Sequence, residues 1–159
     1  MDISVIIAII ILLGYTVAVC IKAGGVPPSL SASVFDLPKN RRWIWTAVLY
    51  AVVLLCVVPY VGKAEDEQTL AFVALAALGF IGAAPLMGEK KDIGYWVHCV
   101  AAMICAVNSQ MVLLFNEPRQ LLMWVPFLIA YAIIGKGWRT RTFWAEMVCF
   151  ASTFVFCLI

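Results

Sequence analysis

Charged side chains are scarce in this chain of 159 residues, where they make up 13% against 65% hydrophobic residues. A water-soluble domain of this size carries roughly a quarter charged residues, because its surface faces water. Most of the surface of this protein is therefore expected to face something other than water. The net charge of +2 is small and gives no reason to expect a nucleic-acid partner.

Histidine and closely spaced cysteine are also lacking. His98 is the only histidine, and the six cysteines fall inside apolar segments without a CxxC pair. A catalytic zinc site needs about three His or carboxylate ligands, and a disulfide framework or structural zinc site has closely spaced cysteines in loops. We therefore expect no metal and no cofactor, and cysteines that act as small apolar packing residues. The multi-histidine centre of alkaline-ceramidase-like membrane hydrolases is excluded on the same ground.

Long apolar segments dominate what is present. They cover residues 3–21, 43–61, 69–87, 93–115, 121–135 and 142–159. Runs of about 18 apolar residues are typical of transmembrane helices, and in lipid the backbone hydrogen bonds must close within each segment. The sequence predicts an all-α polytopic membrane protein, one domain over residues 1–159 that forms a compact bundle of six transmembrane helices. No basic residue precedes the first segment, so we expect it to be kept rather than cleaved as a signal peptide.

Basic residues are distributed unequally between the loops. The first, third and fifth loops hold nine of the eleven Lys and Arg residues, and the second and fourth hold two. Because cytoplasmic loops carry the excess of Lys and Arg, the odd-numbered loops are predicted to be cytoplasmic and both termini to lie on the other side. The predicted location is the inner membrane of a bacterial cell. Tryptophans at the cytoplasmic ends are expected to anchor at the headgroup level: Trp43, Trp45, Trp96, Trp138 and Trp144.

Two ionisable residues lie at one depth within the predicted spans. His98 is five residues into the fourth segment and Glu146 is four residues into the sixth, both counted from the cytoplasmic side. At a rise of 1.5 Å per residue, both lie roughly 6–8 Å below the membrane boundary. Tyr131, Thr46 and Tyr15 fall near the same level. The sequence thus predicts a polar layer in the inner leaflet that binds a ligand.

His98 and Glu146 also have simpler interpretations. Burying an ionisable residue in hydrocarbon costs several kcal/mol unless it is paired, which makes it a functional candidate, and a His–Glu pair is suited to acid–base catalysis. Alternatively, Glu146 pairs with Arg139 or Arg141, and His98 donates one hydrogen bond to a carbonyl and serves only in packing. Both alternatives stay open from the sequence.

Small residues recur at helical spacing in the third and fourth segments. Gly79, Gly82 and Ala83 form a stripe in the third segment, and Ala102 and Ala106 have the same spacing in the fourth. Such stripes let neighbouring helices approach closely. We therefore expect the third and fourth segments to pack tightly together.

The fourth segment also carries a run of polar residues, Asn108, Ser109 and Gln110. Polar side chains within a span usually form hydrogen bonds between helices, worth about 1 kcal/mol each or less. His98, Cys105 and Ser109 share one face of this helix, at spacings of seven and four. The run is expected to connect helices, with a ligand or ion site as the alternative.

The loop over residues 22–42 is predicted to be a cytoplasmic, interfacial element. Glycines end the first segment, and two prolines then prevent its continuation. Ser29 or Ser31 is expected to cap a short helix that lies in the headgroup region, with basic residues facing anionic lipids. An ordered connector without a ligand is the alternative.

The sequence Pro27–Ser31, placed directly after the first of six spans, resembles the proline-serine loop of the six-helix family that contains the Frag and DRAM proteins. Many uncharacterised small bacterial membrane proteins look similar. The resemblance implies a six-helix membrane fold and a link to lipid remodelling or membrane trafficking. It carries over Pro28, Ser29 and Ser31 as positions that shape the loop, and it implies no catalytic residues.

Three functions follow from these features. The preferred one is a non-catalytic membrane protein that binds a lipid or small hydrophobic ligand in the inner leaflet, with membrane lipids and a second copy or another membrane protein as partners. The second is a small oligomeric carrier or channel. The third is an intramembrane lipid-modifying enzyme with His98 as its base.

Overall fold

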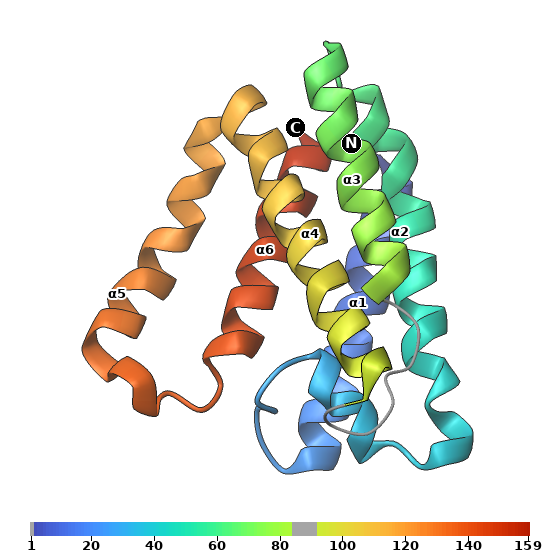
Figure 1. Cartoon of the computed structure of the whole chain (residues 1–159), viewed down its shortest axis with the longest axis vertical. Coiled ribbons are helices and arrows are strands. Elements are labelled where there is room, and N and C mark those ends of the chain that lie inside the picture. The colour runs from blue at the N-terminus through green and yellow to red at the C-terminus, as the bar shows by residue number, and fades with distance from the viewer. Residues whose placement is uncertain (1, 84–91) are drawn as a thin grey trace.

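The computed structural model describes residues 2–83 and 92–159, which form helices joined by short turns (Figure 1). The α-helices are α1 (Ile3–Ala23), α2 (Trp43–Gly62), α3 (Glu67–Ala83), α4 (Ile93–Asn116), α5 (Trp124–Ile134) and α6 (Arg141–Leu158). Short 3-10 helices lie between them: η1 (Ser31–Asp36), η2 (Lys39–Arg41), η3 (Pro118–Met123) and η4 (Gly135–Gly137). The described residues contain no strand, and the all-α class predicted from the sequence is confirmed.

Five helical segments of the described chain are long and apolar enough to cross a membrane. They are Ile3–Ala23, Lys39–Gly62, Ile93–Asn116, Pro118–Gly137 and Arg141–Leu158. The remaining helix, α3, is apolar but has 17 residues. Residues 84–87 of the predicted third segment lie outside the described residues. The helices thus agree with a membrane protein, with five segments of spanning length.

The bundle consists of α1, α2, α3, α4 and α6, and α5 stands at its side. Figure 1 shows α5 leaning away from α4, with its closest approach to the bundle at its η3 end. No residue of α5 is buried. The two chain ends lie at one end of the bundle, and residues 22–42 and the turn before α6 lie at the other (Figure 1).

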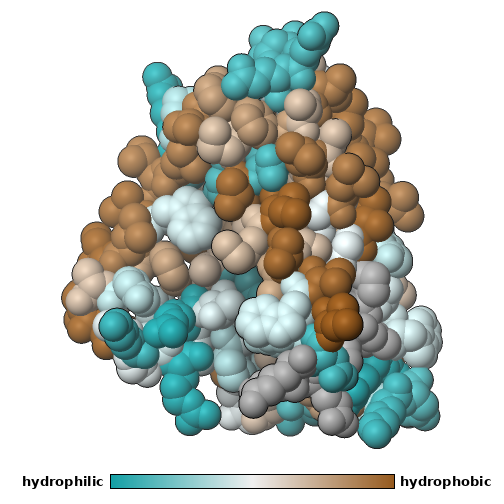
Figure 2. Space-filling model, in the orientation of Figure 1, coloured by the Kyte–Doolittle hydropathy of each residue, from teal (hydrophilic) through white to brown (hydrophobic). Residues whose placement is uncertain are grey.

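Apolar side chains cover the outside of the bundle as well as its interior. Figure 2 shows a broad hydrophobic zone around the middle of the molecule, with hydrophilic residues gathered towards its two ends. Leu54, Val58 and Ile133 are 69%, 74% and 79% exposed. Soluble monomers rarely expose apolar patches beyond a few hundred Å². A surface of this kind is suited to hydrocarbon rather than water.

The end of α1 turns the chain back towards the bundle. Gly24 adopts the left-handed conformation with φ 68°, and the N–H groups of Gly24 and Gly25 donate to the carbonyls of Ile21 and Cys20. Glycine is favoured there because it has no Cβ to clash. The following segment returns to α6, where the N–H of Phe143 donates to the carbonyl of Pro28 at 3.1 Å.

The closest helix contact lies between α3 and α4, at Gly79. A Cβ atom built on Gly79 would lie 2.5 Å from the backbone nitrogen of Cys105 and 2.7 Å from the carbonyl oxygen of Ala101. A Cβ on Gly82 would lie 3.0 Å from the Cβ of Ala101. Gly79 therefore lets the two backbones touch, as the stripe of small residues predicts.

The partner stripe on α4 differs from the predicted one by one position. Ala101 and Cys105 face α3 at the glycines, whereas Ala102 and Ala106 line the cavity described below. The prediction was wrong here because neighbouring residues on a helix are rotated by about 100°, and the spacing of four is the same on both faces. Ala83, at the end of the described part of α3, is 7% exposed and lines the same cavity.

Candidate ligand-binding cavity

An elongated, partly open cavity of about 170 Å³ lies between the helices of the bundle. Its wall is formed by α2, α3, α4, α6 and the first two residues of the turn into η1. The lining extends from Trp45 to Tyr60 along α2 and from His98 to Ser109 along α4. At 1.5 Å per residue, these stretches are about 22 Å and about 17 Å long. Most of the wall is apolar, so its chemistry suits part of a hydrocarbon chain.

The first polar group of the wall is the carboxyl group of Glu146, on α6. Its Oε2 accepts a hydrogen bond from the N–H of Leu30 at 2.5 Å, and its Oε1 accepts one from the hydroxyl of Ser31 at 3.4 Å. Both donors belong to the loop that returns from α1. Arg141 donates instead to the carbonyl of Lys136 at 2.9 Å. The contact of Glu146 is thus with the loop, and the predicted alternative of a pair with Arg141 does not describe it.

His98, on α4, is the second polar group of the wall. Its side chain is 6% exposed, and its Nδ1 lies 2.6 Å from the carbonyl oxygen of Ala83. A carbonyl only accepts hydrogen bonds, so Nδ1 carries the hydrogen, and a neutral ring then has an acceptor at Nε2. His98 and Glu146 lie near the starts of α4 and α6, which run in the same direction (Figure 1). The structure therefore brings both residues to one end of one cavity.

Polar groups at the opposite end are engaged by the protein itself. The hydroxyl of Tyr60 donates to the carbonyl of Ser109 at 3.1 Å. The Ser109 hydroxyl donates to the carbonyl of Ala106 at 2.9 Å, and the Thr153 hydroxyl donates to the carbonyl of Cys149 at 2.9 Å. The wall at this end therefore presents mainly apolar surface to a ligand.

The other residues predicted for the polar layer have different places. Tyr15 is buried outside the cavity, where its hydroxyl lies 3.0 Å from the Ser33 hydroxyl and its ring packs on Trp45 at 5.4 Å between centroids. It supports the loop and the cavity wall from behind. Thr46 is partly buried and lies beside Trp45 in the chain, but is not part of the wall.

Tyr131 does not join the layer. It is 39% exposed on α5 and stacks on Phe127 of the same helix, at 6.3 Å between ring centroids. The predicted depth assumed that the fifth segment packs inside the bundle. Because α5 stands at the side, the same depth along its axis brings Tyr131 no closer to His98.

Trp45 and Leu30 are cavity residues that sequence reasoning missed. Trp45 was predicted to anchor at the headgroup level, but it is 3% exposed and forms part of the wall. Leu30 belongs to the loop that was predicted to lie in the headgroup region, but it is 1% exposed inside the protein. The spacing of Trp43 and Trp45 indicates that only one of them can face lipid, because residues two apart on a helix face different sides. Trp43 is 62% exposed.

The loop over residues 22–42 is folded onto the bundle. Its short helix η1 begins at Ser31, and the hydroxyl of Ser29 accepts a hydrogen bond from the N–H of Ala32 at 2.9 Å. Ser33 and Val34 are buried. The two serines of the quoted motif therefore have different tasks, since Ser29 stabilises the first turn of η1 and Ser31 contacts Glu146. Pro28 supplies the carbonyl that accepts from Phe143.

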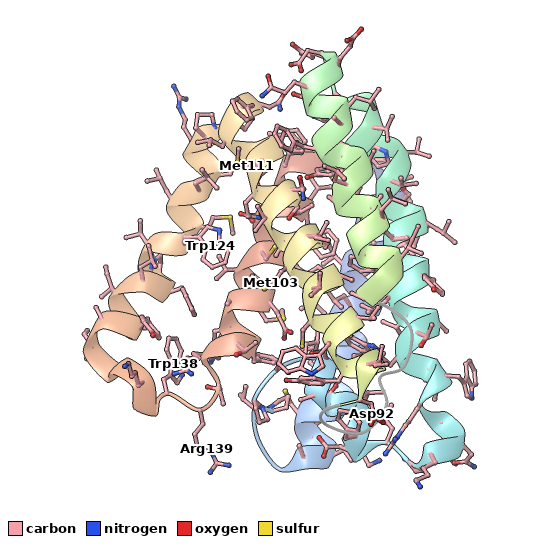
Figure 3. The ribbon with its side chains drawn as sticks, viewed as in Figure 1. Asp92, Met103, Met111, Trp124, Trp138 and Arg139 are labelled. Carbon is pink, nitrogen blue, oxygen red and sulfur yellow. The ribbon has the colours of Figure 1, made fainter. Side chains whose placement is uncertain are left out.

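The polar run on α4 connects three helices through Gln110. Its Oε1 accepts from Trp124 Nε1 at 2.8 Å and from the Ser152 hydroxyl at 3.2 Å. Figure 3 shows Trp124 in the space between α5 and α4. Asn108 instead donates to the carbonyl of Ile104 in its own helix at 2.7 Å. Gln110 thus has the predicted connecting role, and Asn108 does not.

The described residues contain no group of three or more His, Cys, Asp or Glu side chains that is suited to a metal ion. All six cysteines are free thiols, and three of them, Cys56, Cys105 and Cys149, line the cavity. Their neighbours in the wall are mainly apolar, so the thiols serve as small, soft packing groups there.

Comparison with protein-family models, curated proteins and solved structures finds no match to this chain. The resemblance of Pro27–Ser31 to the proline-serine loop of the Frag and DRAM family stays a prediction.

Proposed function

We propose that this chain is a non-catalytic, multi-pass membrane protein that binds a lipid or small hydrophobic ligand inside its helix bundle. The observation that carries the proposal is the elongated apolar cavity of about 170 Å³ with His98 and Glu146 at one end. Ligand pockets are concave, mostly apolar and supplied with a few polar groups that fix orientation. The apolar chain of such a ligand would lie along the long axis of the cavity, and the polar head of the ligand would lie at the end with His98 and Glu146.

The proposal includes six spans, with α3 completing the set, and residues 22–42 on the cytoplasmic side of the inner membrane. Three observations support it. The chain ends lie together, loop 22–42 lies with the turn before α6 at the other end (Figure 1), and residues 22–42 together with residues 135–141 carry seven of the eleven Lys and Arg residues. Cytoplasmic loops carry such an excess. In this orientation the polar end of the cavity lies in the inner leaflet.

Native mass spectrometry of protein extracted gently from its own membrane tests the binding function. We expect wild-type protein to retain a defined lipid or apolar molecule. Ala77 lines the cavity on α3, and Ala77→Leu is expected to fill it and remove the bound mass. Ala74 is exposed on the same helix and outside the wall, so Ala74→Leu adds the same volume where no ligand lies.

Three results would oppose the proposal. Wild-type protein that carries no specific mass and binds no single-chain probe would refute a ligand cavity. Equal retention of the ligand by Ala77→Leu and wild type would show that the ligand lies elsewhere. Turnover of a bound lipid that is lost in His98→Ala, with the fold retained, would replace simple binding by the lipid-modifying enzyme.

A further inference from the structure

The head group of the ligand can be inferred from the hydrogen-bonding capacity of the polar end. This step rests on the proposed binding function. Glu146 presents two carboxyl oxygens, which together offer about four lone-pair sites. The loop uses up to three of these sites, through the N–H groups of Leu30 and Ser31 and the hydroxyl of Ser31. Acceptor capacity therefore remains at Glu146.

His98 adds a second acceptor at the same end. The carbonyl of Ala83 accepts a hydrogen bond from Nδ1 at 2.6 Å, so the ring hydrogen of a neutral His98 lies on Nδ1. Nε2 of a neutral ring then has a free lone pair. Among the described buried side-chain atoms, the unpartnered ones belong to Gln120, which is not in the wall.

Charge at this end has one sign among the described lining residues. Glu146 is an acid, and neither Lys nor Arg belongs to the described part of the wall. A carboxylate away from water needs a partner charge or strong hydrogen bonds. Backbone N–H and hydroxyl groups of the loop provide neutral donors only. A cationic head would bring a charge opposite to that of Glu146 and two or more N–H donors, whereas an anionic head would meet a like charge.

We infer that the ligand is a single-chain amphiphile whose head is a cationic amine, with Glu146 as its counter-ion and His98 as a second hydrogen-bond acceptor. The apolar chain lies along α2 and α4 towards Tyr60, where the hydroxyls are already bound within the protein. Phospholipids with an anionic head and fatty acids are the classes that this arrangement disfavours. Simple alcohols retain a donor but lack the charge.

Equilibrium binding of three chain-matched probes tests the inference. Radiolabelled dodecylamine, dodecanol and dodecanoate are titrated against purified protein in nanodiscs of neutral lipid at pH 7, and Ala77→Leu nanodiscs supply the background for partition into lipid. We expect specific binding of dodecylamine to exceed that of dodecanoate by about tenfold or more, with dodecanol between them, because charge-assisted hydrogen bonds are roughly twice as strong as neutral ones.

Glu146→Gln removes the charge and keeps an oxygen that accepts from Leu30. We expect this variant to bind dodecanol as before and to lose most of the preference for dodecylamine over dodecanol. Helical circular dichroism and a monodisperse elution profile check that it folds.

The outcomes separate the two proposals. Equal or tighter binding of dodecanoate would overturn the amine head and leave the cavity as a ligand site. An amine preference that persists unchanged in Glu146→Gln would also overturn it, because Glu146 would not be the counter-ion. If none of the three probes binds above the Ala77→Leu background, the binding function itself is wrong, and the inference with it.

Discussion

Adding one methyl group at Gly79 should separate α3 from α4 and destabilise the bundle. The new Cβ would lie 2.5 Å and 2.7 Å from two backbone atoms of α4. Backbone atoms cannot rotate away as a side-chain tip can, so the helices themselves must move. Overpacking of this kind typically costs about 1–3 kcal/mol, and the higher helix propensity of alanine returns up to about 1 kcal/mol. We expect a net loss of about 1–2 kcal/mol for Gly79→Ala.

Two other glycines provide matched controls for the same substitution. Gly14 lies within α1, and a Cβ built on it meets nothing within 4 Å. Gly14→Ala should therefore keep the propensity gain and stabilise the protein by about 0.5–1 kcal/mol. At Gly82 the nearest atom is a side-chain Cβ at 3.0 Å. Gly82→Ala should lie between the other two.

Reversible unfolding in mixed micelles, followed by circular dichroism as sodium dodecyl sulfate is added, measures all three variants. The expected order of stability is Gly14→Ala, wild type, Gly82→Ala and Gly79→Ala. If Gly79→Ala is as stable as Gly14→Ala, the two helices do not touch at Gly79 and the reasoning fails.

Two further predictions concern polar contacts outside the cavity. Gln110→Leu removes the acceptor of Trp124 and Ser152, so we expect a loss of about 1 kcal/mol and faster hydrogen exchange in α5. Asn108→Leu, which affects a bond within one helix, should leave α5 exchange unchanged, and equal exchange in both variants would contradict the connecting role. Hydrogen bonds from the backbone N–H and the hydroxyl of Thr69 hold the pKa of Asp66 below its usual value. The stabilisation from Asp66 is therefore present above about pH 4 and lost as pH falls through the lowered pKa. Unfolding of wild type and Asp66→Ala should thus differ at pH 7 and converge in strong acid, and a gap that stays constant with pH would contradict this.

The helices were predictable because their signal is local. An apolar run of sufficient length has no alternative in lipid but a helix, and the predicted segment 93–115 corresponds to α4 at Ile93–Asn116. Glycine and two prolines after residue 23 likewise indicate the end of α1 locally. His98 and Glu146 were brought together correctly because both depths were counted from helix ends at one side of the bundle.

The errors have one physical origin. The sequence contains little information on where each helix lies around the bundle and which of its faces contacts which neighbour. Tyr131 is 39% exposed on α5, which stands at the side of the bundle, so it does not join the other predicted residues. Ala102 and Ala106 have the expected spacing and line the cavity, whereas the atoms nearest to Gly79 and Gly82 belong to Ala101 and Cys105. The contact between the N–H of Leu30 and Glu146 joins residues 116 positions apart. The periodicity of apolar residues in a sequence does not reveal a hydrogen bond between a backbone N–H group and a side chain far away in the chain.

The attachment of loop 22–42 to α6 has a consequence for how the protein is made. The loop leaves the ribosome before α6, but its residues Pro28 and Leu30 are bonded to Phe143 and Glu146 of that helix. Until that helix is synthesised and inserted, the N–H of Leu30 lacks its carboxyl partner and the cavity lacks one wall. The wall of the cavity is therefore complete only after α6 has been made, so in nascent chains that stop before Arg141 the N–H of Leu30 should lack this partner. A quality-control protease would find loop 22–42 accessible in these chains and shielded in the finished protein.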